Sequence, residues 1–509
     1  MTQADPSAPP SLAVAARTAL RDLAIRLVEA ERAHRGHALD LARMLQVLPL
    51  EREGGTRLMR LAEALPRTPD APTRIALLAD KLDPVDWSEA AGAHAGALGA
   101  AVRAAMPAAR AMLPDARDAA AGTASSPLAR ALVMPAARAV LERIGAQFVH
   151  ANDIHAALGR AAREAALHSF DMLGEGARGW PDADRNQRRY LDAIAAVGAI
   201  GRDRPCHARQ GVSIKLSAIH PRFELPRFAR ERGALLERLR ALCGAAADAD
   251  IPLNIDAEEH DRLSMTLELF EALARDASLA GWSGLGIVAQ AYQRSAASTV
   301  ATLVSIARGR VAAGGAPIAV RLVKGAYWDA EVKRAQELGL DDYPVFVRKA
   351  DTDASYARCA RALLDATDAL RPQFATHNAV TVACVLREAA VRGAAPQAFE
   401  LQRLHGMGAA LHAALGALAT RRALPVAARA GASSSAPGAA ADASPGLPQR
   451  RVYAPVGEQR DLLAYLIRRI LENGASTSFV RRFADPDLSA AELVDAELDA
   501  FVAPEETAP

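Results

Sequence analysis

The chain has 509 residues, of which 51% are hydrophobic and 24% charged, and its formal net charge is +2. This length allows two or three domains with at least one large core, and the near-neutral charge gives no general attraction to nucleic acid or an acidic membrane. The cysteines Cys206, Cys243, Cys359 and Cys384 form no CxxC pair, which indicates reduced thiols in a cytosolic protein.

The first third of the sequence predicts helices. Residues 1–85 carry apolar residues at three- and four-residue steps, and residues 86–165 are rich in alanine with proline breaks. We expect a helical arm followed by a helical linker domain. The start of the chain lacks the pattern of a signal peptide, and no uncharged window suits a membrane-spanning helix. We therefore expect a cytoplasmic protein.

From about residue 166 onward, short apolar runs alternate with helical patterns. The eight runs lie at 169–173, 211–217, 252–258, 285–292, 318–325, 373–378, 399–404 and 451–456. Eight strand–helix units in residues 166–485 predict an α/β fold, a (β/α)8 barrel. The Ala/Gly/Ser/Pro-rich segment 427–448 predicts a flexible insertion, and residues 486–509 a C-terminal tail.

Polar residues end nearly every predicted strand. They are Glu175, Lys215, Asp256 with Glu258 and Glu259, Gln290, Arg321 with Lys324, Thr376 with His377, Gln402 with His405, and Tyr453. A single residue of this kind is more often a solvated loop residue. Because active sites of such barrels lie at the carboxyl ends of the strands, eight together predict one shared site.

The chemistry of that site is cationic and aromatic. The sequence has no GxxxxGK[ST] loop, no GxGxxG after a strand, no HExxH and no Cys/His cluster, so we expect no metal. "RLVKGAYWD" (321–329) ends a strand on Arg321, Lys324, Tyr327 and Trp328. The apolar helix "LLAYLIRRILENG" (462–474) carries Tyr465, Arg468, Arg469 and Glu472 on one side. Paired arginines suit a planar carboxylate, so we expect a cofactor site beside an amino-acid-sized carboxylate site.

Eight motifs in order resemble the proline dehydrogenase half of the proline utilisation A (PutA) family. They are "SIKLSAIHPRF", "NIDAEEHDR", "VAQAYQ", "RLVKGAYWD", "FATHNA", "LHGMG", "YAPVGE" and "LIRRILENGASTSFV", and the resemblance runs from about residue 30 to 485. It implies a distorted (β/α)8 barrel that binds FAD and oxidises L-proline to Δ1-pyrroline-5-carboxylate. It also implies transfer of the electrons to membrane quinone, with association of the reduced protein with the membrane surface.

The resemblance also implies roles for individual residues. Arg321 would lie near flavin N5, Lys324 and Gly325 at the phosphate–ribose portion, and Trp328 at the adenine side. The full cofactor set is Val288, Gln290, Arg321, Lys324, Gly325, Trp328, Thr376, His377, Asn378, Gln402, Arg469, Glu472, Ser478 and Phe479. Lys215, Arg468 and Arg469 would bind the proline carboxylate, with Glu175 paired to Arg468. Asp256, Leu322, Tyr327, Leu404 and Tyr453 would shape the pocket around the proline ring.

Several features depart from the family pattern. Val347 stands where the family would have a threonine near the adenine, and no ribbon-helix-helix segment precedes the arm, so we expect no DNA-binding domain. Because the chain ends at Pro509, we expect only the first step of proline catabolism, with a separate pyrroline-5-carboxylate dehydrogenase and a second copy of the chain as candidate partners. Alternatives are another flavin barrel, resembling methylenetetrahydrofolate reductase, and an inactive fragment.

Overall fold

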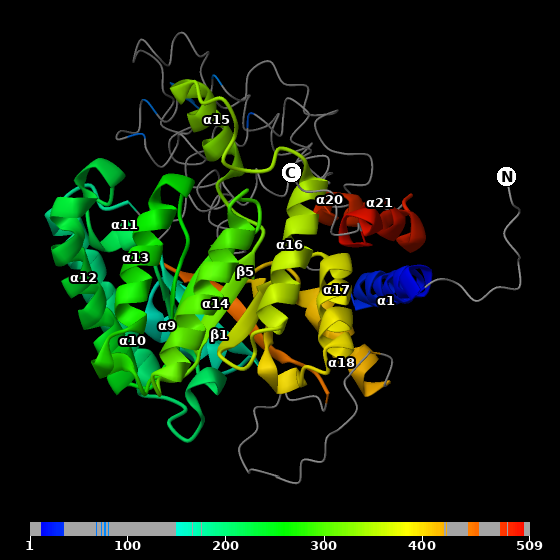
Figure 1. Cartoon of the computed structure of the whole chain (residues 1–509), viewed down its shortest axis with the longest axis horizontal. Helices are drawn as coiled ribbons and strands as arrows, with labels where there is room; N and C mark the ends of the chain where they lie inside the picture. Colours follow the sequence, from blue (N-terminus) through cyan, green and yellow to red (C-terminus); the bar gives the residue numbers. More distant parts are fainter. Residues whose placement is uncertain are drawn as a thin grey trace, which may run out of the picture.

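The computed structural model describes residues 12–34, 149–164, 166–174, 176–421, 446–457, 479–485 and 487–502, with the single residues 57, 68, 73, 76, 77, 80 and 424. Their centre is a closed barrel of eight parallel strands, ordered β1 to β8 around the ring (Figure 1). Among the described helices, none is long and apolar enough to cross a membrane.

All eight predicted strands are present, and the predicted barrel is confirmed. The strands are β1 Leu167–Met172, β2 Gly211–Ile214, β3 Leu253–Ile255, β4 Leu285–Gln290, β5 Ile318–Val323, β6 Leu370–Ala375, β7 Glu400–Leu404 and β8 Gln449–Val456. The ring closes where Ser169 of β1 pairs with Tyr453 of β8. Parallel strands covered on both faces lose most of their contact with water, which explains their apolar sequences.

Helices surround the barrel. They are α9 Ile154–Ala161, α10 Trp180–Gly198, α11 Leu216–Ile219, α12 Leu225–Asp248, α13 Leu263–Ala274, α14 Ala296–Ala312, α15 Trp328–Leu338, α16 Lys349–Leu364, α17 Ala379–Val391 and α18 Ala409–Thr420, with short 3-10 turns η2 Cys206–Ala208, η3 His260–Arg262, η4 Ala277–Leu279 and η5 Pro396–Ala398. α12 shows how sequence sets such a helix: Leu235, Leu239 and Leu242 face inward at three- and four-residue steps.

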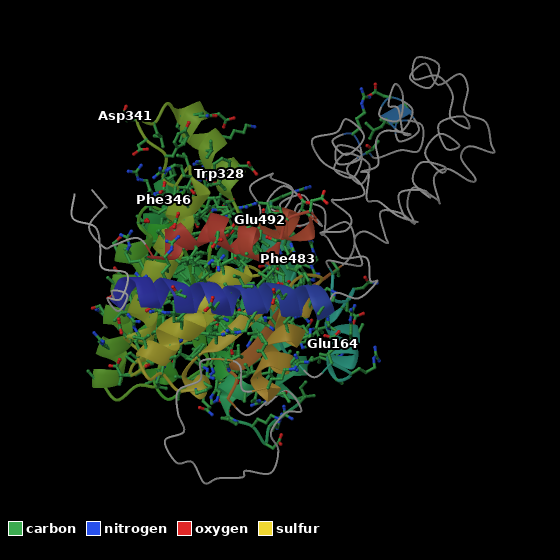
Figure 2. All side chains as sticks on the ribbon, turned by 90° about the vertical axis from the view of Figure 1, so that its right-hand side faces the viewer. Glu164, Trp328, Asp341, Phe346, Phe483 and Glu492 are labelled. Carbon is green, nitrogen blue, oxygen red and sulfur yellow. The ribbon has the colours of Figure 1, made fainter. Side chains whose placement is uncertain are left out.

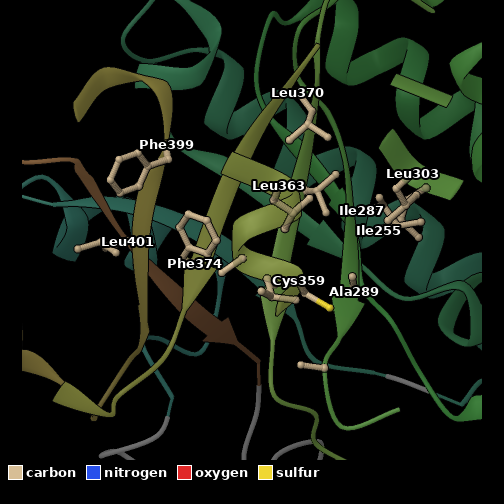
Figure 3. Close-up of a cluster of buried hydrophobic side chains, with 14 of the residues drawn as sticks. Ile255, Ile287, Ala289, Leu303, Cys359, Leu363, Leu370, Phe374, Phe399 and Leu401 are labelled. Atoms are coloured by element: carbon tan, nitrogen blue, oxygen red, sulfur yellow. The ribbon is translucent and has the colours of Figure 1, made fainter. Parts of the chain in front are cut away.

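The hydrophobic core fills the space between the barrel and its helices. Ile287 of β4 and Phe374 of β6 point outward toward Leu303 of α14 and toward Cys359 and Leu363 of α16 (Figure 3). Phe374 and Phe399 meet edge to face, with ring centroids 5.8 Å apart. Burial of these side chains provides the main stabilisation of the fold.

Helices from both ends of the described chain lie together on the outside of the barrel. α1 Leu12–His34 packs on α17, α18 and α21 Ala490–Val502, with the short α20 Phe479–Ala484 nearby. Figure 2 shows α1 and α21 running side by side. Arg21 pairs with Asp495 across this contact at 2.6 Å. The C-terminal helix is therefore part of the barrel's helical coat.

Candidate active site

Strand register directs polar side chains into the barrel. Paired residues on neighbouring strands point to the same side of a sheet, and Ser169 pairs with Tyr453. The guanidinium of Arg321 donates to the hydroxyls of Ser169 (3.2 Å) and Ser213 (3.1 Å), so β1, β2, β5 and β8 all contribute to the interior. Val288 pairs in register with Arg321 and shares this inner face.

Five of the inward side chains form one buried network. Lys215 Nζ donates to Asp171 Oδ2 and Asp256 Oδ2, both at 3.0 Å, and lies 3.1 Å from the Tyr453 hydroxyl. The Tyr453 hydroxyl donates to Asp256 Oδ2 at 2.6 Å, and Arg321 donates to Asp256 Oδ1 at 3.1 Å. Asp256 therefore holds both cations and the tyrosine in fixed positions, as buried charges require.

The charges of this network are balanced but costly to bury. Burial holds the pKa of the Asp171 carboxyl above its ordinary value, although the Lys215 ammonium opposes the shift and the Asp256 carboxylate adds to it. Burial also raises the pKa of Tyr453 well above its ordinary value. Tyr453 thus remains a neutral hydrogen-bond donor, and its ring lies 5.3 Å from the Arg321 guanidinium.

Among the residues that the structure describes, three buried polar atoms around this interior have no hydrogen-bond partner. They are Arg321 Nε, Asp171 Oδ1 and Gln402 Oε1. Unsatisfied buried donors and acceptors are rare in folded proteins and point to a partner that binds there. One cationic donor and two acceptors are thus left open. They would suit a heteroaromatic group that both donates and accepts hydrogen bonds, such as a flavin ring.

Gln290, expected at the flavin edge, binds the segment that follows Asp256. Gln290, the last residue of β4, donates to the Glu258 carbonyl oxygen at 2.9 Å. The Glu258 carboxylate accepts from the Ser217 amide at 3.0 Å and from Arg262 at 2.6 Å. Tyr327 is buried directly before α15.

The segment after β5 contains three predicted cofactor residues, Lys324, Gly325 and Trp328, which differ in burial and contacts. Lys324 pairs with the buried Asp353 of α16. Gly325 has φ +140°, and a Cβ there would lie 2.4 Å from the Tyr292 ring, so only glycine fits. Trp328 is 41% exposed, and its indole donates to the Phe346 carbonyl oxygen at 2.9 Å (labelled in Figure 2).

Residues after β6 and β7 connect to one another. His377 Nε2 accepts from the Leu404 amide at 2.9 Å, and Thr376 Oγ1 accepts from the Asn378 amide at 3.2 Å. Asn378 caps α17, because its Oδ1 accepts from the Val380 amide at 2.8 Å. Leu404 pairs in register with Tyr453 and faces inward, as a pocket residue would, and Gln402 donates to Glu400 on the same strand.

The prediction that Leu322 lines the proline pocket is wrong. Leu322 lies next to the inward Arg321 on β5, pairs in register with Phe374, and is fully buried in the core between strands and helices. Successive residues of a strand point to opposite faces, so its side chain is directed away from the pocket. Phe479, expected to close the cofactor site, packs in the same core, 5.9 Å from the Phe483 ring.

Other predicted site residues lie outside the described residues. They are Glu175, Arg468, Arg469, Glu472 and Ser478, together with most of the 427–448 insertion. The sequence reasoning missed Asp171, Ser169 and Ser213, which bind the two cations of the network. An available signal was the alternation of Ser169 and Asp171 within an apolar strand.

A second polar cluster lies outside the barrel. Ligand atoms of His150, Glu164 and His168 are all within 4.8 Å of one another. His168 Nε2 lies 3.0 Å from the Glu164 carboxylate, which also accepts from Arg160 at 3.1 Å. Because the guanidinium of Arg160 already neutralises the one carboxylate of this cluster, we interpret the cluster as a polar contact that ties the end of α9 to β1.

Comparisons with known proteins agree with this geometry. A sequence model described as "Proline dehydrogenase" matches residues 155–482, more than half of the chain. The chain belongs to the proline dehydrogenase family. Bifunctional protein PutA of Salmonella typhimurium is 42% identical over 377 residues, which are 73% of this chain and 26% of that protein. Proline dehydrogenase of Deinococcus radiodurans is 25% identical over 349 residues, 68% of this chain and 91% of that protein.

Solved structures show the same fold. A crystal structure of a Bradyrhizobium japonicum Proline Utilization A (PutA) mutant aligns with a TM-score of 0.68 and 36% identity, covering 99% of this chain and 48% of that one. PutA from Bdellovibrio bacteriovorus, at 22% identity, has a TM-score of 0.72. The chain therefore spans about half of the first solved chain and about a quarter of its PutA relatives.

The expectation of no DNA-binding domain is wrong. A second sequence model, described as "DNA-binding domain of Proline dehydrogenase", matches residues 40–148. The expectation rested on the absence of a ribbon-helix-helix segment, and the absence of one such motif does not exclude another kind of domain.

Proposed function

We propose that this chain binds FAD at the carboxyl end of the barrel and oxidises L-proline to Δ1-pyrroline-5-carboxylate, with quinone at the membrane surface as the electron acceptor. The observation that carries the proposal is the buried network of Lys215, Asp256, Arg321 and Tyr453 inside a proline dehydrogenase barrel. Two cations fixed by one carboxylate are a preorganised site for anionic groups.

FAD would be held by residues of β4 to β7 and the segments after them. Arg321 and Gln290 would contact the flavin ring, Lys324 the phosphate–ribose portion, and Thr376 and His377 the part beyond it. When bound, FAD would supply a two-electron acceptor for the hydride that leaves C5 of the proline ring, and the proton of the ring nitrogen would go to solvent. The unpaired Arg321 Nε supports this placement, because a guanidinium there stabilises negative charge that develops on the flavin.

Proline would bind beside Tyr453 and Leu404, which face the same side of the sheet. Lys215 already donates to two carboxylates, so it would attract the proline carboxylate mainly by its charge. The planar donors would come from Arg468 and Arg469, whose placement lies outside the described residues. Asp256 would keep Lys215 and Arg321 in position while substrate enters and product leaves.

The experiment that tests this function is L-proline-dependent reduction of an artificial electron acceptor by the FAD-loaded protein. We expect turnover with L-proline and none with methyltetrahydrofolate, the reduced folate that the rival flavin barrel would oxidise in the reverse of its reaction. Turnover with the folate alone would support that rival, and no turnover with either substrate would contradict the proposed activity. Omission of FAD from the apo-protein is the matched control.

A further inference from the structure

The C-terminal helix α21 carries an acid inside its apolar face. Leu493, Val494, Leu498 and Phe501 of this helix are buried at three- and four-residue steps, and Glu497 lies in the same stripe with its side chain 2% exposed. A buried carboxylate is costly unless its partners compensate, so this position asks for an explanation beyond packing.

The hydrogen-bond partners of Glu497 belong to two helices of the barrel, and the Arg482 guanidinium of α20 lies 3.7 Å from Glu497 Oε1. Glu497 Oε2 accepts from Asn378 Nδ2 at 2.6 Å and from Lys349 Nζ at 2.8 Å. Asn378 is the N-cap of α17, and Lys349 is the first residue of α16. One carboxylate thus joins the beginnings of two neighbouring helices, where negative charge is also favoured by the helix dipoles.

The same network continues to the end of β5. Lys349 Nζ also donates to Asp353 Oδ2 at 2.7 Å, and Asp353 pairs with Lys324 through its other oxygen. Burial alone would raise the pKa of Asp353, but the ammonium groups of Lys324 and Lys349 outweigh it and hold this pKa below its ordinary value. Asp353 is therefore ionised and binds both lysines.

A helix with a purely structural role would be served as well by an apolar residue at position 497. Replacing buried ion pairs by apolar residues is often neutral or stabilising. α21 packs against α1, α16 and α17 (Figure 1). Its buried apolar side chains Leu493, Val494, Leu498 and Phe501 already anchor it. A carboxylate at position 497 is explained if its role is to orient Asn378 and Lys349, the two residues that donate to it.

We propose that Glu497 is a positioning residue for the cofactor. It orients Asn378 directly and Lys324 through Lys349 and Asp353, so that the phosphate–adenosine half of FAD is bound only when α21 is in place. This inference rests on the proposed function, which assigns Lys324 to the phosphate–ribose portion, and on the expectation from the family resemblance that Asn378, directly after His377, also contacts FAD. It makes the C-terminal helix, distant in sequence from β5 and β6, part of the cofactor site.

The test compares Glu497→Gln with Asp495→Asn in the full chain. Asp495 lies on the same helix and its ion pair with Arg21 is half-exposed, so this control removes the same charge without touching the network. Dissociation constants of the apo-proteins for FAD and FMN would be measured by flavin fluorescence, with circular dichroism to verify folding. FMN lacks the adenosine half and serves as the internal reference.

We expect Glu497→Gln to raise the Kd for FAD about tenfold or more, about 1.4 kcal/mol, and to leave the Kd for FMN unchanged. Asp495→Asn should stay within about twofold for both. An unchanged FAD affinity, or equal losses for FAD and FMN, would overturn the inference, because a general structural defect affects both flavins. Should Glu497→Gln not fold, Lys349→Met with Glu497→Leu removes both charges at similar volume and carries the same expectations.

The outcomes also separate this inference from the proposed function. Wild-type protein that binds FAD together with a Glu497→Gln variant of equal affinity refutes the positioning role alone. Wild-type protein that binds no FAD refutes the proposed function, and the positioning role with it.

Discussion

Replacing Lys215 by methionine removes the ammonium that bridges Asp171 and Asp256 and keeps most of the side-chain volume. The Lys215 side chain is 9% exposed and its Nζ lies 3.0 Å from each carboxylate. Breaking a buried ion pair by removing one partner costs about 3–5 kcal/mol. The variant can limit this cost by protonating Asp171, whose pKa is already raised by burial.

The free-energy cost of protonating Asp171 in the variant can be worked out from its pKa. Keeping an aspartate with an unfolded-state pKa of about 3.9 neutral at pH 7 costs about 1.4 kcal/mol per pH unit, or about 4 kcal/mol. A raised pKa means that the folded state binds the proton of Asp171 more tightly than the unfolded state does. Asp171 therefore adds to the free energy of unfolding at low pH, and this contribution is lost as the pH rises. In Lys215→Met the ammonium that opposes the upward shift of the Asp171 pKa is gone, so the stability gap between wild type and variant should narrow as the pH falls below 7, by at most about 1.4 kcal/mol per pH unit.

The assay is urea unfolding of both proteins at several pH values from 5 to 8, followed by circular dichroism. Lys333→Met, at an exposed lysine of α15, is the matched control and should change stability by less than about 0.5 kcal/mol. A gap that stays constant with pH would refute the coupling of Lys215 to Asp171. So would a Lys215→Met variant as stable as wild type at pH 7.

Two further predictions concern the backbone after β5 and the arginines expected to bind the substrate carboxylate. Gly325→Ala should destabilise the protein by about 2 kcal/mol or more, because φ is +140° and the new Cβ would meet the Tyr292 ring. The control Gly233→Ala lies in helix α12 with open space around it and should stabilise the protein by about 0.5–1 kcal/mol; thermal unfolding measures both changes. Arg468→Lys and Arg469→Lys should raise KM for proline about 30-fold or more through loss of the planar donor pair, and a wild-type KM in both would place the carboxylate elsewhere.

The barrel was predictable because a parallel strand covered on both faces has a nearly continuous apolar sequence. Strand ends were less accurate: the second predicted strand ran to residue 217, whereas β2 ends at Ile214 and Lys215 is the residue directly before the short helix α11. Side chains alternate along β5, so Arg321 points into the barrel and Leu322 points out toward the helices. Leu322 was assigned to the pocket from the family motif, without regard to this alternation.

Parts of the site depend on tertiary partners that no local pattern reveals. Asp171 was overlooked because a single aspartate in an apolar run has no spacing to indicate its partner, 44 residues away in the sequence. Glu497 was assigned to a C-terminal tail, since its partners Asn378 and Lys349 lie more than 100 residues earlier. Such contacts become visible only once the helices are packed.

The measurement that tests the central claim most directly is the visible spectrum of the FAD-loaded protein under anaerobic conditions as L-proline is added. The network around Arg321 and Lys215 predicts that the absorption band of the oxidised flavin is lost in proportion to the L-proline added until reduction is complete. A flavin that stays oxidised in saturating L-proline would contradict the claim that this barrel oxidises proline.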